Sequence, residues 1–380
     1  KQMSNTSKIN ATWLELDVFL GGEARMSDDA LVSIVVLNYN GGDVLLKCLR
    51  SLYESDYARF EVIVVDNGST DGSVEAVRRD FPEGIMIENG RNLGYGAGNN
   101  VGIKASRGDY IVLLNNDVFV VRGWLKALLE ACAKHSGAGF FQPKILFESD
   151  KGLINSAGNM IHVAGFGLCK GIGEYDSGQY DEEVEIGFAS GACVLFRREI
   201  LGDVGLLDPV YFAFNDDTDW GWRALLHGWR SLYVPSAVVY HQLGHSWGRV
   251  LTARKFHYLE RNRVLTLLKN YSRRSLAILL PVLLFVEFCV LAYALAKGWF
   301  GSKIRSYSDV IRLRGYLREQ RNVLQLRRRL SDREIFPLLT TEIPQGYFGG
   351  MTSGINRVVK FFCRLILETG RLCSWSQAKR

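Results

Sequence analysis

The sequence lacks the cysteine pattern of a disulfide-stabilised protein. Its seven cysteines are scattered over 380 residues with no CxxC pair, and an odd, dispersed set argues for a reducing compartment. Internal repeats and low-complexity tracts are also missing, which excludes repeat architectures. Residues 1–25 mix charged and apolar positions, so we expect no secretory signal there and treat residues 1–30 as an appendage.

A strong charge of one sign is absent from most of the chain. The formal net charge is +6 and the hydrophobic fraction is 47%, which is a globular value. The positive excess lies after residue 250, so it is regional, and we expect no nucleic-acid partner. The length allows one large domain or two.

Short apolar runs alternate with segments of helical periodicity in the first third of the chain. The runs 31–37 and 60–65 predict buried strands, 85–88 predicts a short third strand, and 110–114 predicts a fourth. Helical spacing follows at 43–54 and again before Ala105. This alternation predicts an α/β fold with a right-handed, mostly parallel sheet, and we expect the domain to span residues 31–270.

The periodicity is weaker after residue 120. Further strands are predicted at 140–146, 188–196, 231–235 and 238–241. Residues 164–185 are rich in glycine and acidic residues, and they predict a mobile loop.

Polar side chains follow the predicted parallel strands, where ligands bind in such sheets. They are Asn38, Asn40, Asp66, Asn67, Asn92 and Asp117. As a strong acceptor, the Asp66 carboxylate is suited to a pyrimidine ring N–H. The glycine-rich segment 94–99 follows the third strand and departs from GxGxxG at Asn99, which argues against a nicotinamide dinucleotide.

The triplet Asn115-Asn116-Asp117 ends the fourth predicted strand. A lone aspartate in this place usually caps a helix, but Mg²⁺ and Mn²⁺ also bind through one or two carboxylates together with phosphate oxygens. His241 and His245 have i, i+4 spacing, yet no HExxH motif or cysteine partner supports zinc. His241 follows a predicted strand, so it is either structural or a ligand of the same metal.

Residues 208–223 crowd three carboxylates, Asp216, Asp217 and Asp219, among aromatic side chains. Repulsion and loss of solvent raise the pKa of at least one such carboxylate, which suits a general base. Asp219 and Arg223 are four residues apart on a predicted helix and are expected to form a surface ion pair. Asp217 is therefore the candidate base. The alternative is an acidic helix N-terminus, where aspartate is favoured anyway.

Six short motifs occur in sequence order between residues 35 and 223. They are 35–40, 64–72, 92–100, 113–117, 190–193 and 215–223. Together they resemble the motifs of family 2 glycosyltransferases of the GT-A fold, and most of all those of the rhamnosyltransferase-like branch. The resemblance covers residues 31 to 330.

The resemblance implies a role for each matched position. The residues implied to line the nucleotide sugar are Asn38, Tyr39, Asn40, Asp66, Asn67, Asn92, Gly94, Asn115 and Asn116. The residues implied for the acceptor and sugar side are Gly191, Ala192, Asp216 and Trp220. Asp117, with His241 considered beside it, is implied to hold Mg²⁺ or Mn²⁺, and Asp217 is implied to be the catalytic base.

Two positions depart from the family pattern. Asn115 stands where a DxD triplet has its first acid, which predicts weaker metal binding, and Asp216 replaces the usual glutamate without moving the base. Asp217 would deprotonate an acceptor hydroxyl, whose oxygen attacks the anomeric carbon in line with the leaving nucleotide diphosphate. One base without a second, nucleophilic carboxylate predicts inversion.

Residues 276–296 form an apolar run of roughly the 20 residues that span a bilayer. Pro281 and Glu287 interrupt it, and basic residues flank both ends. Because the positive-inside rule keeps basic flanks cytosolic, we expect a re-entrant or interfacial hairpin kinked at Pro281 in preference to a full span. A buried soluble helix is the alternative. Residues 356–371 predict a second, interfacial amphipathic helix.

The expected layout has a membrane segment at 271–300 and a basic amphipathic helical tail at 301–380. The expected function is transfer of a sugar, with L-rhamnose from dTDP-rhamnose favoured, to a polyprenyl-linked glycan at the cytoplasmic face of the membrane. Transfer of galactofuranose or N-acetylglucosamine is the alternative, as is a non-catalytic nucleotide-binding scaffold. The sequence leaves the oligomeric state open.

Overall fold

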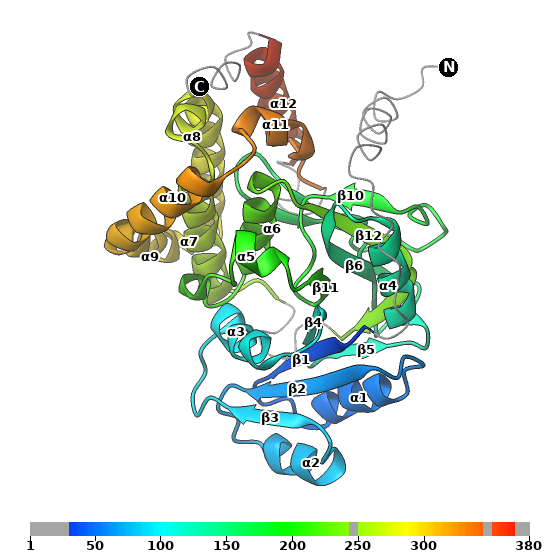
Figure 1. Ribbon diagram of the computed structural model, residues 1–380. Coiled ribbons are helices and arrows are strands. Elements are labelled where there is room, and N and C mark those ends of the chain that lie inside the picture. The colour runs from blue at the N-terminus through cyan, green and yellow to red at the C-terminus, as the bar shows by residue number, and fades with distance from the viewer. Residues whose placement is uncertain (1–29, 243–249, 345–351, 369–380) are drawn as a thin grey trace.

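The computed structural model describes residues 30–242, 250–344 and 352–368. Residues 1–29 of the expected appendage, His245 and the end of the predicted tail helix lie outside these residues. The first four strands are β1 (Val32–Asn38), β2 (Phe60–Asp66), β3 (Ile85–Glu88) and β4 (Tyr110–Asn115). They pair in parallel in the order β4-β1-β2-β3, which confirms the strands predicted there (Figure 1).

The second half of the same sheet mixes strand directions. Its strands are β5 (Val118–Val120), β6 (Ala138–Phe147), β7 (Ile154–Ser156), β10 (Val184–Ile186), β11 (Cys193–Arg197) and β12 (Arg230–His241). The full order is β10-β12-β6-β11-β4-β1-β2-β3, with β5 paired to β12 and β7 to β6. Strand β11 is antiparallel to both β4 and β6, and β12 is parallel to β6. The parallel half therefore continues into a mixed half, and both belong to one α/β sheet.

Two strand boundaries differ from the prediction. The strands expected at 231–235 and 238–241 are one strand, β12, whose register with β6 shifts where Pro235 removes a backbone donor. The strand expected to begin at Phe188 begins only at Cys193. Apolar runs give the presence of these strands but not their ends.

Residues 164–185, expected to form a mobile loop, differ from the prediction because they include a strand and are attached to the sheet. The segment contains β9 (Gly167–Cys169), which pairs with β8 (Asn159–Ile161). Its acidic part is fixed to the sheet because Lys144 Nζ on β6 donates to Asp181 Oδ1 at 2.6 Å. The acidic charge is therefore matched by a cation from a distant strand, which the local composition does not show.

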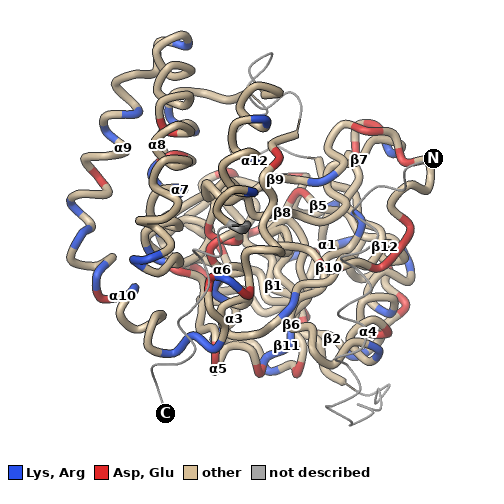
Figure 2. The backbone as a smooth tube through the Cα atoms, turned by 90° about the horizontal axis from the view of Figure 1, so that it is seen from above, with Lys and Arg blue, Asp and Glu red and all other residues tan. Residues whose placement is uncertain are grey.

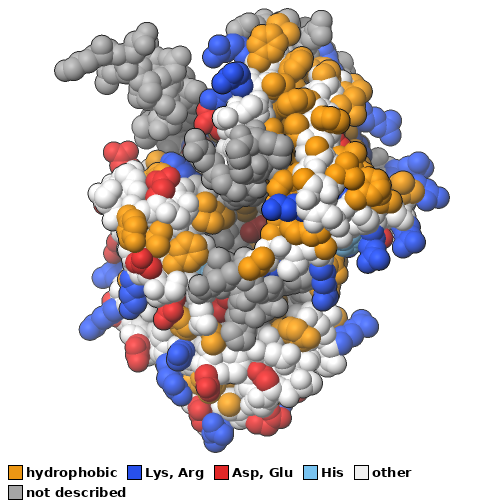
Figure 3. All heavy atoms as spheres, turned by 180° about the vertical axis from the view of Figure 1, so that it is seen from behind, with side chains coloured by type: hydrophobic (Ala, Val, Ile, Leu, Met, Phe, Trp, Pro, Cys, Tyr) orange, Lys and Arg blue, Asp and Glu red, His pale blue; other side chains and the backbone are white. Residues whose placement is uncertain are grey.

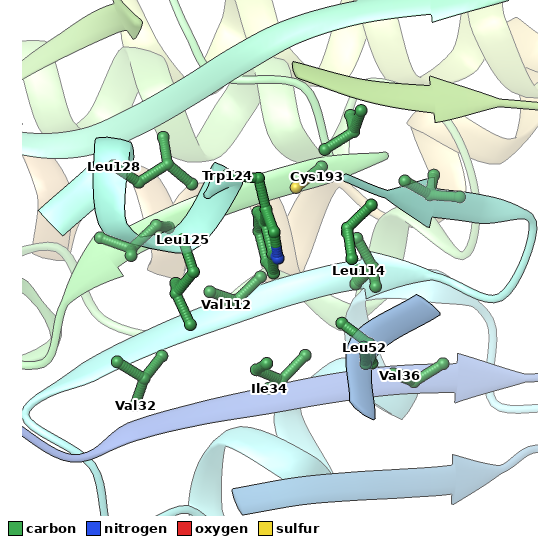
Figure 4. Packing of buried hydrophobic residues seen from close by; sticks show 14 of the residues in the cluster. Val32, Ile34, Val36, Leu52, Val112, Leu114, Trp124, Leu125, Leu128 and Cys193 are labelled. Atoms are coloured by element: carbon green, nitrogen blue, oxygen red, sulfur yellow. The ribbon is translucent and has the colours of Figure 1, made fainter. Parts of the chain in front are cut away.

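Helices cover both faces of the sheet because the strand residues alternate between them. Helices α1 (Gly42–Tyr53), α2 (Ser73–Asp80) and α4 (Trp124–Lys134) pack on one face, and α3 (Tyr95–Ala105), α5 (Ile200–Val204) and α6 (Asp216–Leu226) pack on the other. Figure 4 shows Trp124 and Leu125 of α4 over Ile34 of β1. The neighbouring Val35 points to the opposite core.

Helices also form the C-terminal part of the molecule. They are α7 (Ala253–Asn270), α8 (Arg273–Ala296), α9 (Phe300–Arg312), α10 (Arg314–Arg327), α11 (Asp332–Ile335) and α12 (Thr352–Glu368). They gather at one side of the sheet domain (Figures 1 and 2). Helix α8 runs unbroken through Pro281, so the expected hairpin is wrong. An internal proline removes one hydrogen bond and bends a helix without reversing the chain.

Candidate active site

Asn38, at the end of β1, ties together the loops at the carboxyl end of the sheet. Its Nδ2 donates to Asp66 Oδ1 and to Ser73 Oγ, both at 2.9 Å. Its Oδ1 accepts from Gly41 N at 3.1 Å and from Asn116 Nδ2 at 3.2 Å. The side chain is fully buried. Asn38 therefore fixes the ends of β1, β2 and β4 relative to one another.

The turn after β2 is organised by Asp66. Its Oδ2 accepts two backbone N–H groups of this turn, including that of Ser69, at 2.9 Å. Asn40 has a left-handed φ of 52° and accepts from Thr70 N at 2.8 Å, so the loops after β1 and β2 are joined. Tyr39 is 38% exposed between them. Among these residues, Tyr39 is the one whose ring is open for stacking on a ligand.

The glycine-rich segment closes the same edge of the sheet. Asn67 Nδ2 donates to Gly94 O at 3.1 Å, and Gly94 N donates to Asn92 Oδ1 at 2.8 Å. A Cβ at Gly98 or Gly102 would lie only 2.5 or 2.3 Å from side-chain atoms of β1. These glycines let α3 approach the sheet closely, which accounts for the segment without a dinucleotide. The predicted donor-site residues 38–40, 66–67 and 92–94 thus come together.

Asp117 and His241 meet because β5 pairs with β12. His241 Nε2 lies 3.2 Å from Asp117 Oδ1, and its Nδ1 lies 3.1 Å from Asn155 Oδ1. Both are buried, and the structure shows no cluster of three His, Cys, Asp or Glu side chains within residues 30–242, 250–344 and 352–368. One oxygen and one nitrogen donor side by side suit a Mg²⁺ or Mn²⁺ ion that takes its remaining ligands from phosphates and water.

Asp217 lies at the N-terminus of α6 and contacts the loop before β11. Its Oδ2 accepts from Gly191 N at 3.1 Å and its Oδ1 from Thr218 N at 2.7 Å. Tyr95, the first residue of α3, donates its hydroxyl to Gly191 O at 2.6 Å. Burial raises the pKa of Asp217. Burial and the neighbouring charge of Asp217 raise the pKa of Asp216 well above its ordinary range. The expected crowding effect on the pKa is therefore present.

Comparisons with known proteins identify the family of this chain. The sequence model described as Glycosyl transferase family 2 matches residues 33–205. The chain is 32% identical over 241 residues to N-acetylglucosaminyl-diphospho-decaprenol L-rhamnosyltransferase of Mycobacterium tuberculosis, a match that covers 58% of this chain and 78% of that protein. The chain belongs to glycosyl transferase family 2.

The chain is also similar to a second curated protein and to a solved structure. The chain is 28% identical over 209 residues to the O-antigen biosynthesis protein RfbC of Myxococcus xanthus, covering 52% of this chain and 16% of that protein. The solved structure of GalNAc-T7 with UDP, GalNAc and Mn²⁺ superposes with a TM-score of 0.53 at 15% identity, over 65% of this chain and 49% of that chain. The second likeness concerns the fold alone. The protein is thus a nucleotide-sugar glycosyltransferase with the expected GT-A fold.

Asp219 of this glycosyltransferase is a buried structural residue, which corrects the expected surface pair. Its carboxylate has no exposed surface and accepts from Arg223 Nε at 2.9 Å, Lys269 Nζ at 2.7 Å and Asn270 Nδ2 at 3.0 Å. Burial alone would raise its pKa, but Lys269 and Arg223 outweigh burial and hold the pKa below its usual value. Asp219 is excluded as the base because Arg223 of α6 and Lys269 of α7 neutralise its buried charge, not because it faces solvent.

The loop before α6 is held in an unfavourable backbone conformation. Phe212, Phe214 and Asn215 have φ values of 64°, 66° and 60°, a region that costs a non-glycine residue roughly 1–2 kcal/mol. The side-chain amide of Asn262 on α7 donates to three carbonyl oxygens of this loop, those of Tyr211, Ala213 and Phe214, at 3.0, 2.7 and 2.7 Å. The partners lie 48 to 51 residues apart in sequence, so no local signal could have identified Asn262.

Two residues predicted for the acceptor side are largely buried. Trp220 is 3% exposed and packs edge-on against Phe140 and Phe196. It also lines a small hollow together with Gly191 and Asp217, so its place at the acceptor site stays a prediction. Ala192 is buried, and its carbonyl accepts from Asn115 N at 3.0 Å. Gly191 remains beside Asp217, where a Cβ would lie 2.6 Å from the Tyr95 hydroxyl oxygen.

Replacing Asn262 by leucine should destabilise the loop before α6. Leucine has nearly the same size but no donor, so the bonds to all three carbonyl oxygens are lost. Tyr211 O keeps Arg261 Nη2 as a donor, whereas a buried carbonyl left unsatisfied, such as that of Ala213, costs about 1–3 kcal/mol. We expect a lower midpoint of urea unfolding and a larger proportional loss of activity than of structure. Asn322→Leu, on the exposed side of α10, is the matched control. Equal midpoints and activities for the two variants would contradict the clamp.

Proposed function

We propose that this glycosyltransferase moves L-rhamnose from dTDP-rhamnose to a hydroxyl of a polyprenyl-diphosphate-linked glycan. The observation that carries the catalytic assignment is the position of Asp217, whose carboxylate is hydrogen-bonded to Gly191 next to α3 and the donor loops. The sugar and the lipid carrier follow the Mycobacterium tuberculosis relative, whose name specifies both. Such an acceptor puts the reaction at the cytoplasmic face of the membrane.

Asp217 is the group that we assign to proton transfer. It takes the proton of the acceptor hydroxyl while that oxygen bonds to the anomeric carbon. The bond from the anomeric carbon to the dTDP oxygen breaks in the same displacement, so the configuration inverts. Because two adjacent carboxylates resist double ionisation, the raised pKa of the buried Asp216 favours ionisation of Asp217 alone.

Asp216 is suited to bind the sugar or the acceptor. Its Oδ2 is buried and has no hydrogen-bond partner among the described residues. A buried polar atom without a partner is costly, and a substrate hydroxyl would satisfy it. Asp217 and Asp216 thus divide proton transfer and hydroxyl binding between them.

Asp117 and His241 would hold a divalent ion. When bound, such an ion would neutralise the negative charge on the leaving diphosphate. The side chains of Asn38 and Asn116 keep the loop that carries Asp117 in place through their hydrogen bond of 3.2 Å.

Asp117→Ala should weaken Mn²⁺ binding in the presence of dTDP. The loss should exceed the about 10- to 100-fold caused by removing an outer hydrogen-bond partner of a metal ligand. The free Mn²⁺ signal in electron paramagnetic resonance measures the affinity directly, without turnover. Asp80→Ala, an exposed aspartate at the end of α2, is the control. An unchanged affinity in Asp117→Ala would remove this residue from the metal site.

The donor is tested by a hydrolysis screen in mild detergent. Purified protein is incubated with dTDP-rhamnose, UDP-galactofuranose, UDP-N-acetylglucosamine and GDP-sugars, and the released nucleotide is measured with and without Mn²⁺. Metal-dependent release of dTDP alone would support the proposal. Release of UDP would replace rhamnose by the corresponding sugar and overturn the donor assignment.

A further inference from the structure

Helix α8 has one face buried in the protein and one face open to solvent. Five residues at spacings of three or four form the buried face: Leu279, Val282, Val286, Val290 and Ala294. Four large residues form the open face: Leu280 at 50% exposure, Leu284 at 60%, Phe288 at 70% and Leu295 at 58%. The helix has 24 residues and is about 36 Å long, and the strip from Leu280 to Leu295 covers about 23 Å of it.

Neighbouring helices extend the apolar surface. On α12, which packs against α8, Phe361 is 65% exposed and Leu365 is 46% exposed. On α9, Phe300 and Ile304 are also exposed. Figure 3 shows apolar side chains gathered over this helical part of the molecule. Soluble monomers rarely expose such a contiguous patch, so a partner is expected to cover it.

Glu287 is the one charged residue between positions 276 and 296, and its carboxylate is directed toward α7 and α9. Its carboxylate pairs with Arg263 of α7, with Lys303 of α9 and with the hydroxyl of Tyr307. These partners hold the pKa of Glu287 at about 2 against the opposing effect of burial. The charge that interrupts the apolar sequence is therefore neutralised inside the helical bundle.

The same ion pairs prevent lipid from surrounding α8. A spanning helix needs hydrocarbon on every side or another apolar helix beside it. Here α7 contributes Arg263 and Glu260 at the contact, and Lys303 of α9 joins them. Helix α8 is long and apolar enough to cross a bilayer, and 28% of its most apolar 18 residues are buried inside the protein.

Basic side chains border the strip. Arg273 and Arg274 begin α8 and Lys297 follows its end, while α12 contributes Arg357 and Arg364. Cations at the rim of an apolar face suit anionic headgroups around a hydrocarbon surface. An aqueous protein partner would not require this cationic border.

We propose that the strip of α8, with the exposed apolar residues of α9 and α12, docks on an anionic lipid bilayer with α8 lying in the plane of the interface. The helix buries its open face in the acyl boundary and does not cross the membrane. This inference rests on the proposed function in one respect: a lipid-linked acceptor gives the protein a reason to contact a membrane. It specifies the surface at which a polyprenyl-linked acceptor would reach the site.

Sedimentation with vesicles tests the surface without a donor sugar. Vesicles of phosphatidylcholine with about 30% phosphatidylglycerol have a negative surface potential. They should bind the protein more strongly than vesicles of pure phosphatidylcholine. The double variant Leu284→Ser, Phe288→Ser should lose most of this binding. The control Tyr175→Ser removes an aromatic ring of similar exposure, 66%, from the β9–β10 segment and should bind like the parent.

Labelling with a membrane-impermeant maleimide tests the orientation. Protein carrying Arg274→Cys or Lys297→Cys is added to the outside of preformed vesicles, and labelling is compared with that of the parent. In-plane docking predicts that both ends of α8 label from outside. Protection of one end until the vesicles are opened would show a span and overturn the proposal.

Two other outcomes would also overturn the proposal that this surface docks on a membrane. Binding that survives the double serine variant would place membrane contact elsewhere. Concentration-dependent dimers without vesicle binding would make a second copy of the chain the occupant of the strip. Donor hydrolysis in detergent is measured separately, so failure of the membrane face leaves the proposed transfer reaction standing, and the reverse also holds.

Discussion

Asp217→Asn is expected to lower kcat for sugar transfer by about 10²- to 10⁴-fold, the contribution of a positioned general base. Asparagine keeps the size of the side chain and an oxygen that accepts the hydrogen bond from Gly191 N, which is 3.1 Å from Asp217 Oδ2. It cannot take up a proton. KM for the donor should change much less, because we assign nucleotide binding to the loops after β1, β2, β3 and β4. Initial rates with the lipid-linked acceptor measure both constants.

The pH profile separates loss of the base from loss of structure. Protonation of Asp217 removes the base, so the activity of the parent enzyme should fall as the pH is lowered. Because burial raises the pKa of Asp217, this fall should begin at a higher pH than for an ordinary aspartate. Asp217→Asn should lack the fall, whereas Asp80→Asn on α2 should keep it. A profile of the parent shape in Asp217→Asn would contradict the assignment.

Lys269→Met should lower the free energy of unfolding by about 3–5 kcal/mol, the cost of breaking a buried ion pair by removing one partner. Lys269 Nζ lies 2.7 Å from both Asp208 Oδ2 and Asp219 Oδ2, and all three side chains are buried. Methionine fills the space of the lysine stem but leaves both carboxylates without this cation. Within the described part of the chain, Arg223 then remains as the cationic partner of Asp219. Urea unfolding with a common m value measures the loss.

The pH dependence identifies the cause of this loss. The folded pKa of Asp219 is lowered, so its contribution is present above the unfolded value of 3.8 and disappears as the pH falls through the folded pKa. The difference between the parent and Lys269→Met should therefore shrink in acid. Lys126→Met, on the exposed side of α4, should stay within about 0.5 kcal/mol of the parent. A difference that is constant down to low pH would assign the loss to packing.

Much of the donor half follows from the sequence because its information is local. Strands β1, β2 and β4 are buried apolar runs, and most of the polar site residues lie at or just beyond the end of a strand. Asn38, Asp66 and Asn67 could therefore be assigned to one edge of the sheet before any contact was known. Their hydrogen bonds to one another confirm that edge.

The other half depends on contacts between distant segments. Whether Asp219 faces solvent is decided by Lys269, which lies 50 positions later. The i, i+4 spacing to Arg223 correctly gives the pair but not its burial. In the same way, Pro281 and Glu287 suggest an interruption of α8. The helix continues because Arg263 and Lys303 neutralise the carboxylate from neighbouring helices.

The hydrogen bonds from Asn262 of α7 to the loop before α6 limit where this chain can be recombined with a relative. The family match ends at residue 205, before the loop and the aspartates of α6, whereas the amide that fixes the loop is Asn262 of α7. Chimeras that exchange the C-terminal helices between relatives would therefore alter the alignment of the proposed base together with the proposed membrane docking. Recombination that carries residues 210–226 along with α7 should preserve turnover, whereas a junction between them should yield folded but slow enzymes.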